Sequence, residues 1–188
     1  MTQPAAPRRL FNVLVLCTGN SARSILGEAL FNHLGSGRIR AFSAGSRPAG
    51  YVNPVALETL EKHGVPLPAA RSKSWNEFGK AGAPPLDFIV TVCDSAARET
   101  CPLWPGRPAT AQWGIADPAH VEPLAARRAA FEVAYGQLER RIKVFLALPL
   151  ESMSPQEIKA AARRIHEKAM QEPVRRPDPS GSTGGWPN

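Results

Sequence analysis

A chain of 188 residues, 43% of them hydrophobic, is long enough to bury one core and too short for two comfortable domains. No run approaches the roughly 20 apolar residues of a membrane span, and residues 1–9 lack the apolar segment of a secretory signal, so we expect a cytoplasmic protein with no membrane partner. The formal charge of +7 comes with no aromatic stacking pattern or nucleic-acid motif, so we expect solvated helix faces and no nucleic-acid partner.

Apolar runs and helical periods alternate along the chain. Residues 11–16 and 86–92 are strongly apolar, which is typical of strands buried on both faces of a sheet. Helical spacing of apolar residues follows the first run and ends at Gly35. The predicted elements are, in chain order, strand 11–16, helix 24–34, strand 39–43, a helix from Asn53-Pro54 to Gly64, a helical turn 74–78, strand 86–92, a short strand 110–113, helix 123–148 and a helix that begins at the capping box 154–157.

This alternation predicts an α/β fold, a three-layer sandwich in which helices cover both faces of a parallel sheet. We expect a flexible N-terminal arm (1–10), a catalytic domain (11–150), a C-terminal helix (151–170) and a disordered tail (171–188) rich in Pro, Gly and Ser. Ligands bind such sheets at the carboxyl ends of the strands. We therefore expect functional residues where the apolar strands end.

The most informative motif lies where the first apolar strand ends. It reads Cys17, Thr18, Gly19, Asn20, Ser21, Ala22, Arg23 and Ser24. A turn from strand to helix directs backbone amides into one concavity, and the helix N-terminus and the fork of Arg23 favour an oxyanion there. The same field favours a thiolate, so we expect Cys17 to be a nucleophile with a lowered pKa and Ser24 to be hydrogen-bonded to its sulfur. The alternative is a cysteine that packs as a small hydrophobe in a tight turn.

Asp117 stands at the end of a long region, 93–118, that is rich in Pro and Gly. A thiolate that displaces an oxygen from a phosphate-like centre needs a proton donor for the leaving group, and an aspartate beside the bound oxyanion fits that role. Asp-Pro is also common in plain turns, which is the alternative for this residue.

The chain has three cysteines, an odd number, and one of them lies in the predicted nucleophile loop. This favours working thiols in a reducing compartment over a set of structural disulfides. A phosphatase needs one thiolate, whereas Cys93 and Cys101 add two more on one stretch of chain after the second apolar strand. Cys93 can attack an adduct on Cys17, and Cys101 can then attack Cys93. No further cysteine or well-spaced histidine pair completes a tetrahedral zinc site, so we expect no metal.

These residues together resemble the arsenate reductases built on the low-molecular-weight protein tyrosine phosphatase fold. The resemblance covers about residues 12–148 and is carried by the 17–24 motif, Ser43-Ala44-Gly45, the strand ending at Cys93, Cys101-Pro102, Trp113-Gly114 and Asp117-Pro118. It implies a central four-stranded parallel sheet and the reduction of arsenate to arsenite. It also implies that Cys17 is the nucleophile, that Arg23 and the amides from Thr18 to Ser24 bind the oxyanion, that Asp117 is the general acid, and that Cys93 and Cys101 are resolving thiols.

We therefore expect a thiol-dependent arsenate reductase of arsenic detoxification, a monomer or weak dimer that also binds phosphate or sulfate as substrate mimics. No bound cofactor is expected; the reductant is an external thiol system, either thioredoxin, glutaredoxin with glutathione, or mycothiol. One alternative is a protein tyrosine or small-molecule phosphatase that forms a cysteinyl-phosphate, although such enzymes usually carry an aromatic residue beside the acid and residues 117–120 contain none. The other is a non-catalytic oxyanion-binding or thiol-sensing module in which Asp117 is idle.

Overall fold

A computed structural model describes residues 9–67, 69–94, 96 and 104–171 of the chain. Nearly all of the expected N-terminal arm and tail, and Cys101, lie outside these residues. The elements are β1 (Phe11–Cys17), α1 (Arg23–Leu34), β2 (Ile39–Gly45), α2 (Pro54–Lys62), η1 (Trp75–Gly79), β3 (Phe88–Thr91), β4 (Ala109–Gln112), α4 (Leu124–Leu146), η2 (Leu150–Ser152) and α5 (Pro155–Gln171), where η marks a 3-10 helix.

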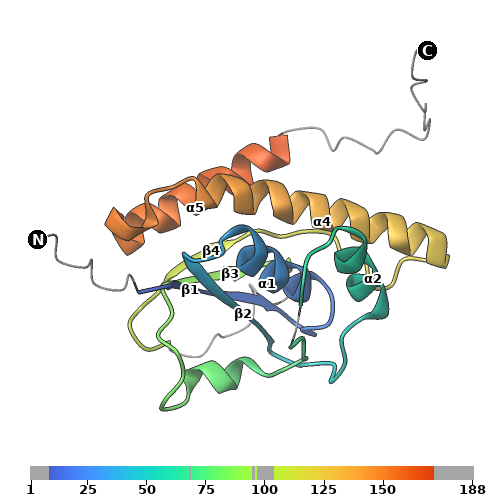
Figure 1. Ribbon diagram of the computed structural model, residues 1–188, viewed down its shortest axis with the longest axis horizontal. Coiled ribbons are helices and arrows are strands. Elements are labelled where there is room, and N and C mark those ends of the chain that lie inside the picture. Colours follow the sequence, from blue (N-terminus) through green and yellow to red (C-terminus); the bar gives the residue numbers. More distant parts are fainter. Residues whose placement is uncertain (1–8, 68, 95, 97–103, 172–188) are drawn as a thin grey trace, which may run out of the picture.

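The four strands form one parallel sheet in the order β2-β1-β3-β4. The chain runs from β1 through α1 to β2 on one side, and then crosses to β3 on the other side of β1 (Figure 1). The direction of the connections therefore reverses at the carboxyl end of β1, where Cys17 lies. Parallel sheets bind ligands at such a reversal.

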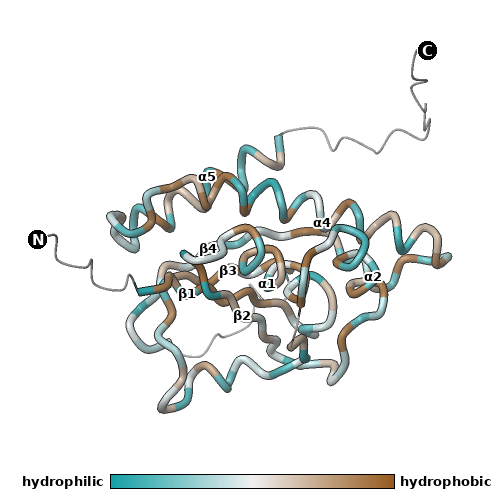
Figure 2. Tube along the Cα trace, viewed as in Figure 1, coloured by the Kyte–Doolittle hydropathy of each residue, from teal (hydrophilic) through white to brown (hydrophobic). Residues whose placement is uncertain are grey.

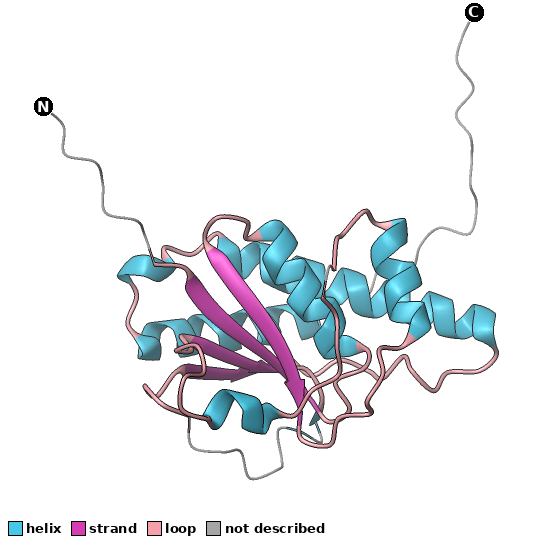
Figure 3. Ribbon diagram, turned by 60° about the horizontal axis from the view of Figure 1, so that its bottom comes forward, coloured by secondary structure: helices cyan, strands magenta, loops and turns pink. Residues whose placement is uncertain are grey.

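Two hydrophobic clusters lie on opposite faces of the sheet, since Val13 and Val15 of β1 belong to the larger and Leu14 and Leu16 to the smaller. Helices α1, α2, α4 and α5 lie on the side of the larger cluster, and the short η1 covers the other side (Figures 1 and 3). Hydropathy follows this arrangement, with the strongly hydrophobic residues along the strands and the hydrophilic ones on the outer turns of the helices (Figure 2). The predicted α/β sandwich with four parallel strands is confirmed, and its layers are unequal.

The C-terminal helix shares the core of the sheet. Trp113, which follows β4 and is fully buried, donates a hydrogen bond from Nε1 to the carbonyl of Ala162 in α5 at 2.9 Å. Phe88 and Phe145 stack beside it with ring centroids 4.6 Å apart, and Phe31 stacks on the indole at 6.2 Å. The first half of α5 (Pro155–Gln171) is thus packed against the sheet through Ile158, Ala161 and Ala162.

The helix begins as the capping box predicts. The Glu157 carboxylate accepts hydrogen bonds from the amide and the hydroxyl of Ser154, and the Glu157 amide donates to that hydroxyl. No helix in the described part of the chain combines the length and the apolar character that a membrane crossing requires.

Candidate active site

The loop of residues 18–22 joins β1 to α1 at the carboxyl edge of the sheet. Asn20 has a φ of +44°, in the left-handed region, and its backbone amide donates to the sulfur of Cys17 at 3.1 Å. The first turn of α1 begins at Arg23, so the helix N-terminus also faces this sulfur. The local backbone is arranged to hold negative charge.

The carbonyl groups of the loop are engaged elsewhere. Those of Thr18, Gly19 and Ser21 accept hydrogen bonds at 3.0, 2.8 and 2.8 Å from backbone amides in the segment 47–53. Because a trans peptide group points its N–H away from its C=O, the amides of the same peptide groups face the opposite side. The chain after β2 therefore orients the loop as a set of donors.

The segment 45–53 approaches the loop closely, and Gly45 makes this approach feasible. A Cβ atom at this position would lie 2.4 Å from the carbonyl oxygen of Thr18 and 3.0 Å from the amide nitrogen of Asn20. Neither atom is the end of a flexible side chain, so a side chain here would displace the loop. Gly45 is a requirement of the site that its residue type alone does not reveal.

A buried hydrogen-bond network surrounds the sulfur of Cys17. The Oδ1 of Asn20 accepts from the amide of Lys73 at 2.8 Å, so its Nδ2 donates, at 2.9 Å each, to the hydroxyls of Ser24 and Ser43. The hydroxyl oxygen of Ser24 also lies 2.9 Å from the sulfur of Cys17, and either group can donate in this contact. The predicted contact between Ser24 and Cys17 is confirmed.

Burial raises the pKa of the Cys17 thiol, because the residue is only 4% exposed. The hydrogen bonds from Ser24 and from the Asn20 amide act in the opposite direction, and the neighbouring Cys93 raises the pKa further. The expected lowering of this pKa is therefore not found. The physical reason is that the sulfur is desolvated while the guanidinium of Arg23 is bound elsewhere.

Arg23 and Asp117 form an ion pair across the site, with Nη2 2.7 Å from Oδ2. The other nitrogen, Nη1, donates to the carbonyl of Ile115 at 2.9 Å, and the amide of Ala119 donates to the remaining oxygen of Asp117 at 3.0 Å. The two residues predicted to bind the oxyanion and to protonate the leaving group thus meet above the loop.

A hollow of about 810 Å³ opens above Cys17 and is bordered by Arg23 and Asp117. Tyr51 and Leu124, which are 58% and 43% exposed, line it further out. Residues 117–120 contain no aromatic side chain, but Tyr51 reaches the hollow from the segment between β2 and α2. The sequence does not predict that Tyr51 lies at the hollow, because this depends on contacts between distant segments.

The loop residues predicted to bind an oxyanion divide into two groups. Those that line the hollow are Thr18, Gly19, Ser21, Ala22 and Arg23. The other two, Asn20 and Ser24, are fully buried behind the loop and hold it in shape.

Cys93 follows β3, the strand beside β1, and reaches the same edge of the sheet. Its sulfur lies 3.6 Å from the hydroxyl of Thr18 and accepts a hydrogen bond from the amide of Ala96 at 3.4 Å. Cys17 and Cys93 are both buried free thiols. Cys101 lies outside the described residues, and within those residues no three His, Cys, Asp or Glu side chains gather as a metal site would require.

Comparisons with known proteins point to one family. The family described as low molecular weight phosphotyrosine protein phosphatase matches residues 12–164. The arsenate reductase of Shouchella clausii is 33% identical over 134 residues, which are 71% of this chain and 93% of that protein. The arsenate reductase of Halalkalibacterium halodurans is 31% identical over the same shares of both chains.

Solved structures have the same fold. The crystal structure of arsenate reductase from Archaeoglobus fulgidus aligns with a TM-score of 0.56 and 28% identity, over 72% of this chain and 99% of that one. A thioredoxin-dependent arsenate reductase of Corynebacterium glutamicum aligns with a TM-score of 0.52 and 25% identity, over 74% of this chain and 63% of that one. The low molecular weight protein tyrosine phosphatase from T. tengcongensis aligns at 0.54 and 26%, over 71% and 98%.

Proposed function

Because this chain belongs to the low molecular weight phosphotyrosine protein phosphatase family, we propose that it applies the cysteine chemistry of that fold to arsenate and acts as a thiol-dependent arsenate reductase. The observation that carries the proposal is the placement of a second thiol at the nucleophile loop, with the sulfur of Cys93 3.6 Å from the hydroxyl of Thr18. A phosphatase needs one thiol at this edge of the sheet. A reductase needs two that can meet.

In the first step Cys17 gives its thiol proton to the Asp117 carboxylate and the resulting thiolate attacks the arsenic(V) of arsenate. An As–O bond breaks, and Asp117 passes the proton to the departing oxygen, which leaves as water. Loop amides and the fork of Arg23 stabilise the charge on the remaining oxygens. An oxyanion above Cys17 competes with Asp117 for Arg23, since the two side chains are paired at 2.7 Å in its absence. Binding thereby frees the Asp117 carboxylate to take up the thiol proton and then to act as an acid.

In the second step Cys93 attacks the sulfur of Cys17. The S–As bond breaks, its electron pair remains on arsenic, and arsenic(III) leaves as arsenite while a Cys17–Cys93 disulfide forms. Cys101 then attacks the Cys93 sulfur, which restores the Cys17 thiolate and leaves a Cys93–Cys101 disulfide. An external thiol reductant returns both cysteines to thiols.

We infer that this reductant is of the thioredoxin type, because the Corynebacterium glutamicum relative is described as thioredoxin-dependent. Glutaredoxin with glutathione and mycothiol are the other sources of the same two electrons. Such a relay works in a reducing cytoplasm, where we place the protein, as a monomer or weak dimer without a bound cofactor.

The decisive experiment measures arsenite formed from arsenate with each of the three reductant systems. Cys17→Ser should form none. Cys101→Ser should form about one equivalent per chain and then stop in the thioredoxin system, because its disulfide stays between the two buried sulfurs. A Cys101→Ser variant with the full multiple-turnover rate in all three systems would remove Cys101 from the relay.

One observation favours a second candidate, a phosphatase that acts on an aryl phosphate. Tyr51 and Leu124 border the hollow and offer an apolar wall to a phenyl ring. Hydrolysis of p-nitrophenyl phosphate without any reduction of arsenate would establish that activity. Inactivity in both assays, combined with binding of sulfate or phosphate, would indicate a non-catalytic oxyanion-binding or thiol-sensing module.

A further inference from the structure

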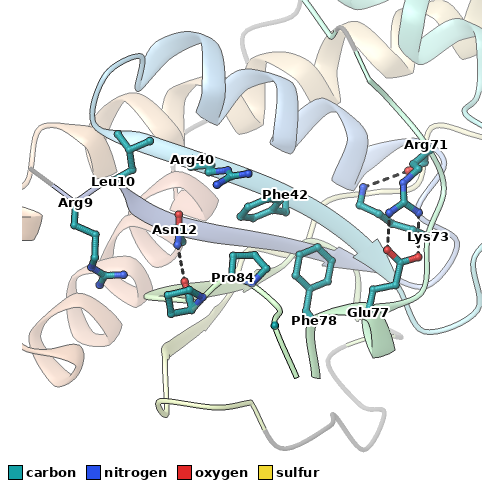
Figure 4. A pocket seen from close by; sticks show the side chains of 12 residues that line it. Arg9, Leu10, Asn12, Arg40, Phe42, Arg71, Lys73, Glu77, Phe78 and Pro84 are labelled. Atoms are coloured by element: carbon teal, nitrogen blue, oxygen red, sulfur yellow. Dashed lines mark hydrogen bonds and ion pairs between the residues drawn. The ribbon is translucent and has the colours of Figure 1, made fainter. Parts of the chain in front are cut away.

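A cationic pocket of about 730 Å³ is bordered by β2 and η1 (Figure 4). Its buried ammonium group, that of Lys73, lies 3.5 Å from the carboxylate of Glu28, and the guanidinium of Arg71 is held by Glu77. Carboxylates of the protein thus balance these two cations. This pocket gives no reason to expect a bound anion.

A smaller pocket, of about 270 Å³, lies between α4 and α5, which run antiparallel to each other (Figure 1). Apolar side chains line it, among them Val144, Leu148 and Ile165, and Val144 is 54% exposed. The described part of its wall contains no carboxylate, and its charged side chains are all cationic: Arg140, Arg141, Arg164 and Lys168. Ligand pockets combine an apolar wall with a few polar groups that fix orientation, so this wall fits an anion with a hydrocarbon part.

The carboxylates of the two helices do not balance this charge. Each helix has two of them, and all four bind groups outside the pocket: Glu132 binds Lys62, Glu139 binds Lys143, Glu157 binds Ser154 and Glu167 binds Arg163. Among the residues that the structure describes, none forms an ion pair with any of the pocket's four cations. The pocket therefore concentrates positive charge.

Arg141 is buried in this wall, with an exposed fraction of 2%. Its Nη1 donates to the carbonyl of Gln137 at 3.0 Å, and its Nη2 lies 3.9 Å from the sulfur of Met170. Its Nε is buried and has no acceptor within the described ranges. Burial lowers the pKa of Arg141, and the charge of Arg140 lowers it further. Burying a guanidinium is costly unless an anion compensates it, so an anion in the pocket would complete the site.

We propose that the pocket between α4 and α5 binds a small organic anion, a carboxylate that carries a short hydrocarbon chain. The carboxylate binds Arg141, and the chain lies along Val144 and Leu148. Leu148 follows Arg141 by about two helical turns, so the charged and the apolar ends of the pocket are separate, as in such an anion. No residue of the pocket belongs to the nucleophile loop, so this binding goes beyond the proposed function and does not depend on it.

The test measures binding of butanoate, hexanoate and octanoate to the full chain by titration calorimetry at neutral pH. Affinity should rise about fourfold for each methylene group added, because each one buries further apolar surface. Octanamide, which has the same chain and no charge, should bind at least about tenfold more weakly than octanoate. An affinity independent of chain length, or equal binding of octanamide and octanoate, would overturn the proposal.

Variants locate the binding at this pocket. Arg141→Met should weaken octanoate binding at least about tenfold, because it removes the buried partner of the carboxylate. The matched control is Lys143→Met, which removes the same charge from the same helix at a residue bound to Glu139 outside the pocket and should bind like the parent. Since the buried charge has no described anionic partner, Arg141→Met should unfold at a temperature no lower than the parent.

An Arg141→Met variant that does not fold is covered by Val144→Glu, which changes an exposed side chain of the same pocket. The new carboxylate would neutralise the cations and repel the ligand, so octanoate binding should be lost. Equal octanoate affinities in the parent and in the folded variants would overturn the proposal.

Other occupants of the pocket would give different results. A parent chain that does not bind octanoate overturns the proposal. In that case, a dimer that dissociates in Val144→Glu would identify a second copy of the chain as the occupant. Faster trypsin cleavage at Arg175 or Arg176 in Arg141→Met than in the parent would instead identify residues 172–188, which contain Asp178.

Discussion

The sulfur of Cys93 lies 3.6 Å from the hydroxyl of Thr18, the residue that directly follows Cys17. The contact arises because β1 and β3 are neighbours in parallel register, with Leu16 opposite Thr91, so that both strands end at one edge of the sheet. Two thiols from strands far apart in the sequence are thus delivered to the same loop. This arrangement makes the second step of the proposed reaction open to direct test.

Replacing Cys93 by serine should separate the two steps. Cys17 remains able to attack arsenate, but an external thiol must then do what the Cys93 thiol does in the parent. Because a neighbouring group in the same molecule has a very high effective molarity, we expect the multiple-turnover rate to fall at least about a thousandfold. Arsenite release by rapid quench measures this loss, and phosphate inhibition constants should stay near those of the parent. Parental turnover of Cys93→Ser would exclude this cysteine from the relay.

Replacing Asp117 by asparagine should remove the proton donor while keeping the shape of the site. We expect kcat to fall by about 10²- to 10⁴-fold, the range for loss of a general acid. Glu58→Gln is the matched control, since it removes a negative charge from the border of the same hollow at a position bound to Arg128. If both variants lose activity equally, the loss comes from the changed net charge of the hollow and not from a missing proton donor.

Introducing a methyl group at Gly45 should displace the loop. The new Cβ would lie 2.4 Å from the carbonyl of Thr18, so we expect phosphate binding, followed by titration calorimetry, to weaken at least tenfold. Gly136→Ala in α4 is the control, because a Cβ there meets open space and should stabilise the helix by up to about 1 kcal/mol. Unchanged binding by Gly45→Ala would mean that the loop tolerates the displacement.

Removing α5 should destabilise the whole domain. A chain that ends before Ser154 exposes the indole of Trp113, which is fully buried, and removes the acceptor of its Nε1 at Ala162. We expect a loss of more than about 3 kcal/mol in unfolding free energy, with a red shift of tryptophan fluorescence. Trp113→Phe, which removes the hydrogen bond but keeps the aromatic packing, should cost about 1 kcal/mol. A truncated chain as stable as the parent would show that α5 is an appendage.

The stability of the fold should fall at alkaline pH because of Cys17. Burial raises the pKa of this thiol in the folded state, so above about pH 8.5, the usual pKa of a thiol, the unfolded chain loses its proton first. Unfolding free energy should then decline with a slope of up to about 1.4 kcal/mol per pH unit from this group. Urea titrations of the parent and of Cys17→Ala between pH 7.5 and 10 measure the difference. Parallel curves would show that the thiol has the same pKa in both states.

Patterns local in the sequence predicted the framework well. The apolar run before Cys17, the Asn53-Pro54 helix start and the capping box at Ser154 all lie where the structure has β1, the start of α2 and the start of α5. The strand predicted at 86–92 is shorter, Phe88–Thr91, since Leu86 packs beneath η1 before the ladder begins. The motif at 17–24 also located the hollow above Cys17.

Contacts between distant segments could not be predicted. A lysine between two serines is typical of a protein surface. Lys73 is nevertheless buried, and it forms an ion pair with Glu28, 45 positions earlier in the chain. Tyr51 sits in a loop with no aromatic pattern around it, and only the packing of that loop beside Arg23 brings it to the hollow. The prediction of a lowered Cys17 pKa was wrong for the same reason. The pKa is raised by burial, and burial depends on residues distant in the sequence.

The segment after β2 holds the loop in place before any ligand is bound. Backbone amides of residues 47–53 donate to the carbonyl oxygens of Thr18, Gly19 and Ser21, which fixes the orientation of these peptide groups. For the proposed oxyanion site, preorganised donors lower the cost of ordering the loop on binding. Part of the affinity of that site would then come from backbone hydrogen bonds made by a different segment of the chain.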